Sequence, residues 1–348
     1  MSAPASVLLR SVVSLLLAAP VAAQQGAASD PFAFLSPVVT VTSAERSRLE
    51  AGRAVVRLLP RANREMAIFA AVSVDVGGER LVAWVRNIAE LKKSEQVDAI
   101  GRFSEPPRLE DLSELVLDDE DLDAIRTCRP RSCGLKLSEE EMAALARAAA
   151  PSTGDWKQAV QEAYRRVVLG RVESYLASGY QAARPYADHS APVAPGDEFG
   201  VLLDRSPFLA ERLPQFARHL REYPGGRAED IESFLYWSKE TLGGKPMVIV
   251  SHVFVSQQQL AGVPDAIVVS RHVYANHYMT GSLAVTAVTG RREGSRGYLT
   301  YLNRSRVDVL GGFFGRITRL FIERRLRAEA AEVVEGLRTR LESLPPGT

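Results

Sequence analysis

The histidines best placed to do chemistry are His252, His272 and His277, which fall close together on strand-like segments. Strand alternation places His252 and His277 among apolar neighbours, as pocket or core residues would be. In VVSRHVYANHY the same alternation predicts His272 on one face with Tyr274 and Tyr278, and His277 on the other. His252 and His277 are therefore candidate general bases or ligand contacts. The simpler alternative is a buried histidine held by a backbone or tyrosine hydrogen bond.

A metal site would need two of these histidines together with Glu240 or a water molecule. The sequence has no H-E-x-x-H motif or other tight ligand spacing, and the acidic segment Asp118–Asp121 lacks the glycine and spacing of an EF-hand loop. It also has no nucleophile elbow and no phosphate-binding glycine loop. No metal or cofactor is therefore expected, and no catalytic residue is assigned.

Two other clusters are candidates for ligand contact. FLYWSKE carries Tyr236, which would give an aromatic lining to a pocket, or else pack in the core of a sheet. NRSRVD carries Arg304, which could hold a carboxylate or phosphate by two hydrogen bonds. Alternatively, Asp308 caps the following helix and pairs with an arginine. The candidate ligand-binding residues are His252, His277, Tyr278, Tyr236 and Arg304.

The two cysteines, Cys128 and Cys133, lie in the turn-rich segment CRPRSC. In an oxidising compartment this spacing predicts a local disulfide bond. The alternative is a redox-active pair, but the spacing is not C-x-x-C and no βαβ pattern adjoins it. A structural disulfide is therefore the prediction.

Residues 1–23 have the features of a secretory signal peptide: a basic residue, a short apolar core and small residues before Gln24. The apolar core is far shorter than the roughly 20 residues that a transmembrane helix requires. No cysteine stands directly after this apolar core, so a lipid-anchored form is not expected. We predict cleavage after Ala23, a flexible leader over residues 24–48, and an exported protein that is periplasmic or secreted.

Composition excludes several classes of protein. The chain has 43 Lys and Arg against 42 Asp and Glu, so no basic field indicates a nucleic-acid partner. Hydrophobic residues make up 46%, and the one long apolar run is N-terminal, which argues against both wholesale disorder and a polytopic membrane protein. A basic C-terminal helix leaves transient membrane contact open. Composition does not determine the oligomeric state.

The order of predicted elements places strands at both ends of the chain and helices in the middle. Strand-like runs occupy 53–60, 66–76 and 96–103, with an amphipathic helix over 81–91, and five more strand-like runs follow residue 231. A long amphipathic helix is predicted over 307–343. Segregated antiparallel strands and helices indicate an α+β fold.

This order resembles the START-like (SRPBCC, or helix-grip) superfamily. The resemblance is carried by VSVDVGGERLVAWVRNIAEL near the N-terminus and by GYLTYLNRSR running into the last helix. It implies an antiparallel sheet gripping a long C-terminal helix, with an apolar cavity between them. The domain would comprise residues 49–104 and 231–348, and residues 105–230 would be a helical insertion. The whole chain also resembles a family of exported bacterial proteins with no assigned function.

The function expected from this reading is an exported soluble protein that binds a lipid-like or apolar small molecule between the sheet and the C-terminal helix. A first alternative is an enzyme that uses the same cavity with His252 or His277 as the acid or base, in a hydrolase-, cyclase- or isomerase-type reaction. A second is a protein-interaction module acting through the helical insertion. The sequence carries no motif that decides between them.

Overall fold

The computed structural model describes residues 30–150, 155–226, 228, 230–241, 244–257, 264–290, 296–310 and 315–345. These residues form an α+β fold around one 8-stranded antiparallel sheet, with strand order β1-β2-β8-β7-β6-β5-β4-β3. The predicted signal peptide lies outside the described residues. The strands are β1 (Val55–Leu58), β2 (Glu65–Val74), β3 (Val97–Arg102), β4 (Glu232–Thr241), β5 (Pro246–Gln257), β6 (Ala266–Ala275), β7 (Met279–Thr289) and β8 (Gly297–Val307).

The two ends of the chain build this sheet together. Strand β2 pairs with β8 along its whole length, from Glu65 opposite Arg306 to Val74 opposite Gly297. At the other edge, β3 pairs with β4. The chain on either side of the predicted insertion therefore contributes to one sheet, and the insertion leaves from the edge strand β3 and re-enters at its neighbour β4.

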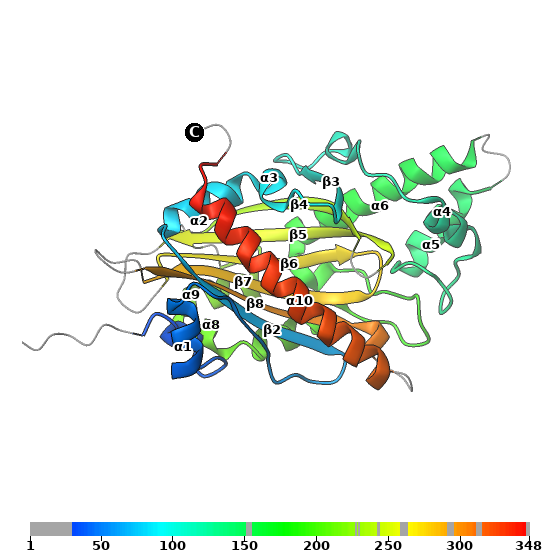
Figure 1. Ribbon diagram of the computed structural model, residues 1–348. Helices are drawn as coiled ribbons and strands as arrows, with labels where there is room; N and C mark the ends of the chain where they lie inside the picture. The colour runs from blue at the N-terminus through cyan, green and yellow to red at the C-terminus, as the bar shows by residue number, and fades with distance from the viewer. Residues whose placement is uncertain are drawn as a thin grey trace, which may run out of the picture.

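One face of the sheet is covered by α2 (Gly78–Arg86), α3 (Ile88–Lys92) and the long C-terminal helix α10 (Gly315–Glu342). Helix α10 lies obliquely across the strands (Figure 1). Leu81 and Val85 of α2 and Val334 and Leu341 of α10 are buried in one cluster with residues of the sheet. This confirms the predicted sheet gripping a long C-terminal helix.

The C-terminal helix begins later than residue 307, where the sequence pattern placed its start. Val307 belongs to β8, where it pairs with Met279 of β7. The Asp308 amide donates to the carbonyl oxygen of Tyr278. These backbone bonds hold the chain in the sheet, so the apolar residues here serve strand and turn packing before α10 begins at Gly315.

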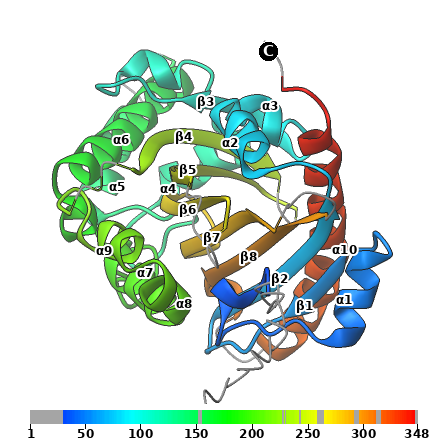
Figure 2. The same ribbon diagram turned by 90° about the vertical axis from the view of Figure 1, so that its left-hand side faces the viewer.

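The opposite face of the sheet is covered by the insertion, so both faces are buried. Figure 2 shows α10 on one side of the sheet and α6 to α9 on the other. The capping box of Ser138 with Glu141 and the Asp155 cap form as predicted. The insertion helices are α4 (Asp119–Thr127), α5 (Glu139–Ala148), α6 (Trp156–Ser178), α7 (Pro195–Asp204), α8 (Pro207–Arg212) and α9 (Pro214–Glu222).

The prediction of a flexible leader over 24–48 is wrong from Asp30 onward. A 3-10 turn (Ala33–Leu35) and α1 (Ser43–Glu50) form there. Phe32, Phe34 and Leu35 are at most 2% exposed and pack in the insertion-side core. The small, polar composition of the segment concealed these apolar anchors, whose burial ties the segment to the fold.

Cys128 and Cys133 form the predicted disulfide bond, with their Cα atoms 4.4 Å apart. The bond closes the turn that follows α4, where Arg129 and Ser132 form an isolated antiparallel bridge. Among the described residues, no helix combines the length and the apolar character needed to cross a membrane.

Candidate functional site: a cavity under the C-terminal helix

A cavity of about 490 Å³ lies between the sheet and the helices α2, α3 and α10. The cavity is the part of the space between the sheet and these helices that side chains do not fill. Its volume falls within the range of small-molecule sites. The apolar part of its lining comes from both layers: Leu81, Val85, Ile88, Leu91, Val333 and Leu337 from the helices, and Val253, Val268 and Ala284 from the sheet.

The sheet side of the cavity also carries a row of polar side chains. Ser251 of β5 pairs with Tyr236 of β4 on one side and with His272 of β6 on the other. Farther along the sheet, Ser282 of β7 pairs with Ser305 of β8. Residues paired across strands share a face, so the row runs under the helices. A buried sheet face is usually apolar, and this one offers hydrogen-bonding groups to the cavity.

The hydroxyls at the β7–β8 end of this row are already bonded to one another. Ser282 Oγ lies 2.9 Å from Ser305 Oγ, and Ser305 Oγ donates to Asn303 Oδ1 at 2.8 Å. The Asn303 amide nitrogen donates to Ser282 Oγ at 3.2 Å. Burial raises the pKa of the neighbouring Tyr301 hydroxyl to about 12. This end is therefore neutral and internally connected.

An ion pair lies beside the other end of the row. Lys92, the last residue of α3, places its ammonium 2.6 Å from Oε1 of Glu240 on β4. Ser238 donates to the same carboxylate oxygen at 2.5 Å. The Lys92 ammonium also lies 5.6 Å from the centre of the Tyr236 ring. Burial alone would raise the pKa of Glu240, but the attraction of Lys92 outweighs it and the pKa falls below its ordinary value. Both groups are therefore charged.

His272 is the histidine that lines the cavity. Its Nδ1 is buried and has no hydrogen-bond partner among the described residues. Burial lowers the pKa of His272 to about 4, although the charge of Glu240 opposes the shift. At neutral pH the ring is therefore uncharged.

Of the five candidate residues predicted from sequence, Tyr236 lines this cavity. His252 lies on the opposite face of the sheet, under α6, where the Tyr175 hydroxyl lies 2.8 Å from its Nδ1. Burial, followed by the charge of Arg271, holds the pKa of His252 well below its ordinary value. Its ring packs on Phe254 with centres 4.0 Å apart. The structure thus places His252 in the arrangement of the simpler alternative: buried and held by a tyrosine.

Arg304 also lies on the insertion-side face. Its guanidinium is 2.5 Å from Oε1 of Glu65, a residue with no exposed surface. The same carboxylate is 2.7 Å from Arg205 of the insertion. Arg304 therefore pairs with a buried acid of the protein and is not directed into the cavity.

His277 and Tyr278 lie at the β6–β7 turn, away from the cavity lining. His277 Nε2 lies 2.9 Å from Asp121 of α4, and both residues are buried. Tyr278 adopts a φ of 55° and its carbonyl accepts the Asp308 amide. The turn thus fastens the insertion and the end of β8 to the sheet. Asp308 pairs with Arg64 at 2.6 Å and with Lys136, both distant in the sequence. It pairs with neither Arg304 nor Arg306, which bind Glu65 and Glu198, so the alternative of a local pair is wrong.

A β-bulge explains why strand alternation misplaced Tyr274. The ladder between β5 and β6 shifts register between Val250 and Ser251, so Val250 pairs with Tyr274 and Ser251 with His272. Val273 and Tyr274 consequently both join the insertion-side core. His272 therefore does not share a face with Tyr274.

Lys92 and Asn303 are polar residues of the cavity lining that were not singled out from the sequence, although a signal for each was present. Lys92 follows the apolar positions Ile88 and Leu91 at helical spacing and so shares their face. Asn303 alternates with Leu299 and Tyr301 along β8, on the face under α10. A polar residue in phase with a buried strand face is a signal for a pocket.

One group of potential metal ligands occurs among the described residues. Asp188, His189 and Asp308 bring three ligand atoms within 4.8 Å of one another. The Lys136 ammonium contacts both carboxylates, at 3.4 Å from Asp188 and more closely at Asp308. The cluster thus already holds a cation of the protein.

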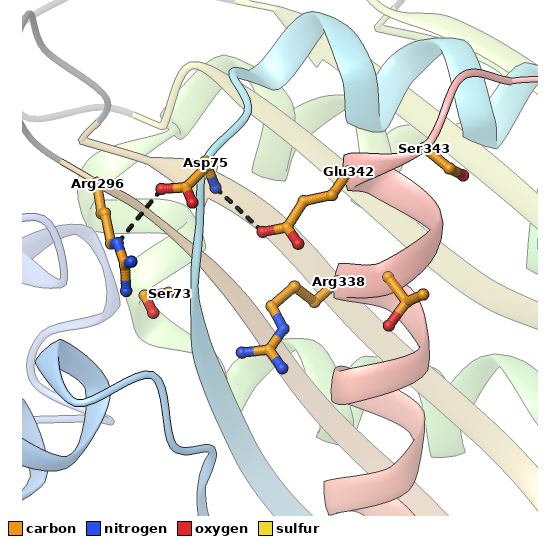
Figure 3. A pocket seen from close by; sticks show the side chains of 7 residues that line it. Ser73, Asp75, Arg296, Arg338, Glu342 and Ser343 are labelled. Carbon is orange, nitrogen blue, oxygen red and sulfur yellow. Dashed lines mark hydrogen bonds and ion pairs between the residues drawn. The ribbon is translucent and has the colours of Figure 1, made fainter.

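A second hollow, of about 430 Å³, lies at the surface near the end of α10 (Figure 3). Arg296 points toward Asp75, with a separation of 3.3 Å, and the Asp75 amide donates to Glu342 at 3.3 Å. Arg338 donates to the carbonyl oxygen of Gly52. These charged side chains thus already bond to other groups of the protein, and none of the predicted candidates lines this hollow.

Comparisons with known proteins leave the family open. No protein-family model and no curated protein matches the chain. Among solved structures, the crystal structure of TTHA0849 from Thermus thermophilus matches with 10% identity and a TM-score of 0.24, over 42% of this chain and 88% of that one. A likeness at this level supports neither a shared fold nor a shared function.

Proposed function

We propose that the protein is an exported binding protein that holds an apolar small molecule in the cavity between the sheet and α10. The observation that carries this proposal is the cavity itself, about 490 Å³ of space lined by apolar helix residues on one side and a partly polar sheet on the other. A hollow of this size with a largely apolar lining and a few polar groups has the form of a small-molecule site.

The apolar lining supplies the driving force for binding. Ile88, Leu91 and Leu337 face the cavity from the helices, and Val253 and Val268 face it from the sheet. Removing apolar ligand surface from water there contributes about 25 cal/mol per Å². The polar groups around His272 and Tyr236 then fix the orientation of the ligand.

Export is part of the same proposal. It is supported by the signal-peptide pattern of residues 1–23 and by the Cys128–Cys133 disulfide bond, which is typical of an oxidising compartment. The helix-grip resemblance supports a binding role by analogy of fold. Arg324 and Arg327 are exposed on α10 and would favour transient contact with an anionic membrane during ligand exchange.

The test is a fluorescence titration with the neutral apolar dye N-phenyl-1-naphthylamine. Ala284 lines the cavity, so Ala284→Phe would fill part of it. We expect wild-type protein to bind the dye and Ala284→Phe to bind it at least about tenfold more weakly. The control is Val201→Phe on α7, an exposed position on the other side of the sheet. Equal dye affinity in wild type and Ala284→Phe would overturn the proposal, provided that circular dichroism shows both folded.

A second candidate function, acid–base catalysis in the same cavity, is favoured by one observation. His272 places an uncharged imidazole against the cavity. His252 and His277, which the sequence offered for this role, bond to Tyr175 and Asp121 instead. An enzyme would retain ligand binding but lose turnover in His272→Gln, whereas a carrier has no turnover to lose.

A further inference from the structure

The positively charged groups of the cavity lining are paired with other groups of the protein. Lys92 pairs with Glu240 at 2.6 Å. Arg340 of α10 donates to the carbonyl oxygens of Leu91 and Lys93. The other charged residues that α10 brings to the lining are acidic, Glu329 and Glu332. No described cation of the lining is therefore left for an anionic ligand.

The cavity lining also contains uncharged polar groups that could bond to a ligand. Nδ1 of His272 is buried and lacks a partner among the described residues. Ser270 and Thr286 add hydroxyls to the same sheet face, on β6 and β7. A ligand hydroxyl or carbonyl that bonds to the cavity side of His272 or to these hydroxyls would replace the water that these groups lose on binding.

We propose that the cavity selects an apolar ligand that carries a neutral hydroxyl or carbonyl group, and discriminates against the matching carboxylate, with His272 as the principal polar contact. This inference rests on the proposed binding function and adds the chemical class of the ligand. A hydroxyl can donate to an imidazole nitrogen or accept from one, so it suits either tautomer of a neutral ring, and a carbonyl suits the donor tautomer.

A ligand with a carboxylate should bind more weakly than the matching neutral ligand, for two reasons. It would have to compete with Glu240 for Lys92, and Glu240 is already held by Ser238 as well. It would also lose its hydration on entering the cavity. Burying a charge without a partner is costly. Lys92 and Glu240 together thus act as a neutral unit that excludes anions.

The experiment compares 1-dodecanol with dodecanoate as competitors of N-phenyl-1-naphthylamine at about pH 7.5, where dodecanoate is ionised and His272 is neutral. We expect dodecanol to displace the dye at a concentration at least about tenfold lower than dodecanoate. In Glu240→Gln, Lys92 loses its carboxylate partner, so this ratio should fall at least about tenfold. The matched control is Glu232→Gln on the same strand, where the exposed Glu232 pairs with Arg86; it should keep the wild-type ratio.

A double variant, Lys92→Met with Glu240→Met, removes both charges and keeps the site neutral, so it should still prefer dodecanol. If Glu240→Gln does not fold, the preference of this double variant for dodecanol over dodecanoate tests the inference instead. Preference for dodecanoate in the wild type, or an unchanged ratio in folded Glu240→Gln, would overturn this inference alone. Absence of dye binding, or dye binding that Ala284→Phe leaves intact, would overturn the proposed function and this inference with it.

Discussion

The ammonium of Lys92 lies 2.6 Å from the carboxylate of Glu240, and this contact joins the two separated parts of the sheet domain beside the cavity. Lys92 ends α3, before the insertion, and Glu240 lies on β4, after it. The pair therefore brings chain segments on either side of the insertion to one place. It also fixes the electrostatic character of that end of the cavity.

Lys92→Met should destabilise the protein by about 2 to 3 kcal/mol, because it leaves the buried Glu240 carboxylate without its cation. Lys92 is about one quarter exposed, at 27%, so the loss should fall below that of a fully buried pair. Urea unfolding measures it. The Lys92→Met, Glu240→Met variant should recover most of the loss. A double variant that is less stable than the single one would contradict this account.

His272 should make the free energy of unfolding depend on pH. Its pKa is about 4 in the folded protein and about 6.5 in the unfolded chain, so the unfolded chain binds more protons between these values. Stability is therefore present above pH 6.5 and is lost as pH falls. His272 alone should account for a loss of about 2 kcal/mol between pH 7 and pH 5.

Urea unfolding at these two pH values checks this prediction, with His272→Gln as the variant that cannot titrate. Its loss of stability on acidification should be smaller than that of wild type by about the stated amount. His189→Gln, at an exposed position, is the control and should behave as wild type. Equal losses in wild type and His272→Gln would show that His272 does not titrate with a lowered pKa.

Tyr175→Phe should cost about 1 to 3 kcal/mol of stability without changing dye affinity. The substitution removes the hydroxyl that lies 2.8 Å from Nδ1 of His252 and leaves that buried nitrogen without this partner. Because both residues lie on the insertion-side face, the cavity is unaffected. Thermal unfolding and the dye titration measure the two effects. A large loss of dye affinity in a folded Tyr175→Phe would mean that His252 does contribute to the ligand site.

Arg304→Met should destabilise the protein by about 3 kcal/mol, because Glu65 is completely buried and would retain one cation, Arg205, in place of two. Glu65→Met together with Arg304→Met should restore part of this stability, since Arg205 is one third exposed, at 34%, and can be hydrated. Chemical denaturation gives both values. Dye affinity should stay at the wild-type level in each folded variant, and a loss of binding would place Arg304 in the ligand site.

The sheet and the long helix were predictable because their signals are local. The continuous apolar run of β2, the alternation in β8 and the apolar stripe of α2 are local sequence patterns. The disulfide bond and the Ser138 capping box are likewise short-range patterns. Where a long-range contact decides the structure, prediction failed. The start of α10 depends on Val307 pairing with Met279, and the order of the leader depends on a core that Phe32 and Phe34 enter from a distance.

The candidate site was harder to predict, because both faces of the sheet are buried. With an apolar layer on each side, His252 and His272 have similar sequence surroundings, although one lies under α6 and the other lines the cavity. Strand alternation predicts which residues share a face of the sheet, but it does not predict which face borders the cavity. The bulge at Val250 and Ser251 then breaks the alternation at the point where it mattered most.

The most direct test of the central claim is native mass spectrometry of the protein purified from the periplasm or medium of a bacterial host, followed by solvent extraction. The account predicts one apolar molecule with a hydroxyl or carbonyl group per chain in the wild type, and its loss in folded Ala284→Phe. Wild-type protein that carries no such molecule, and takes up none of a mixed lipid extract, would contradict a ligand cavity beneath α10.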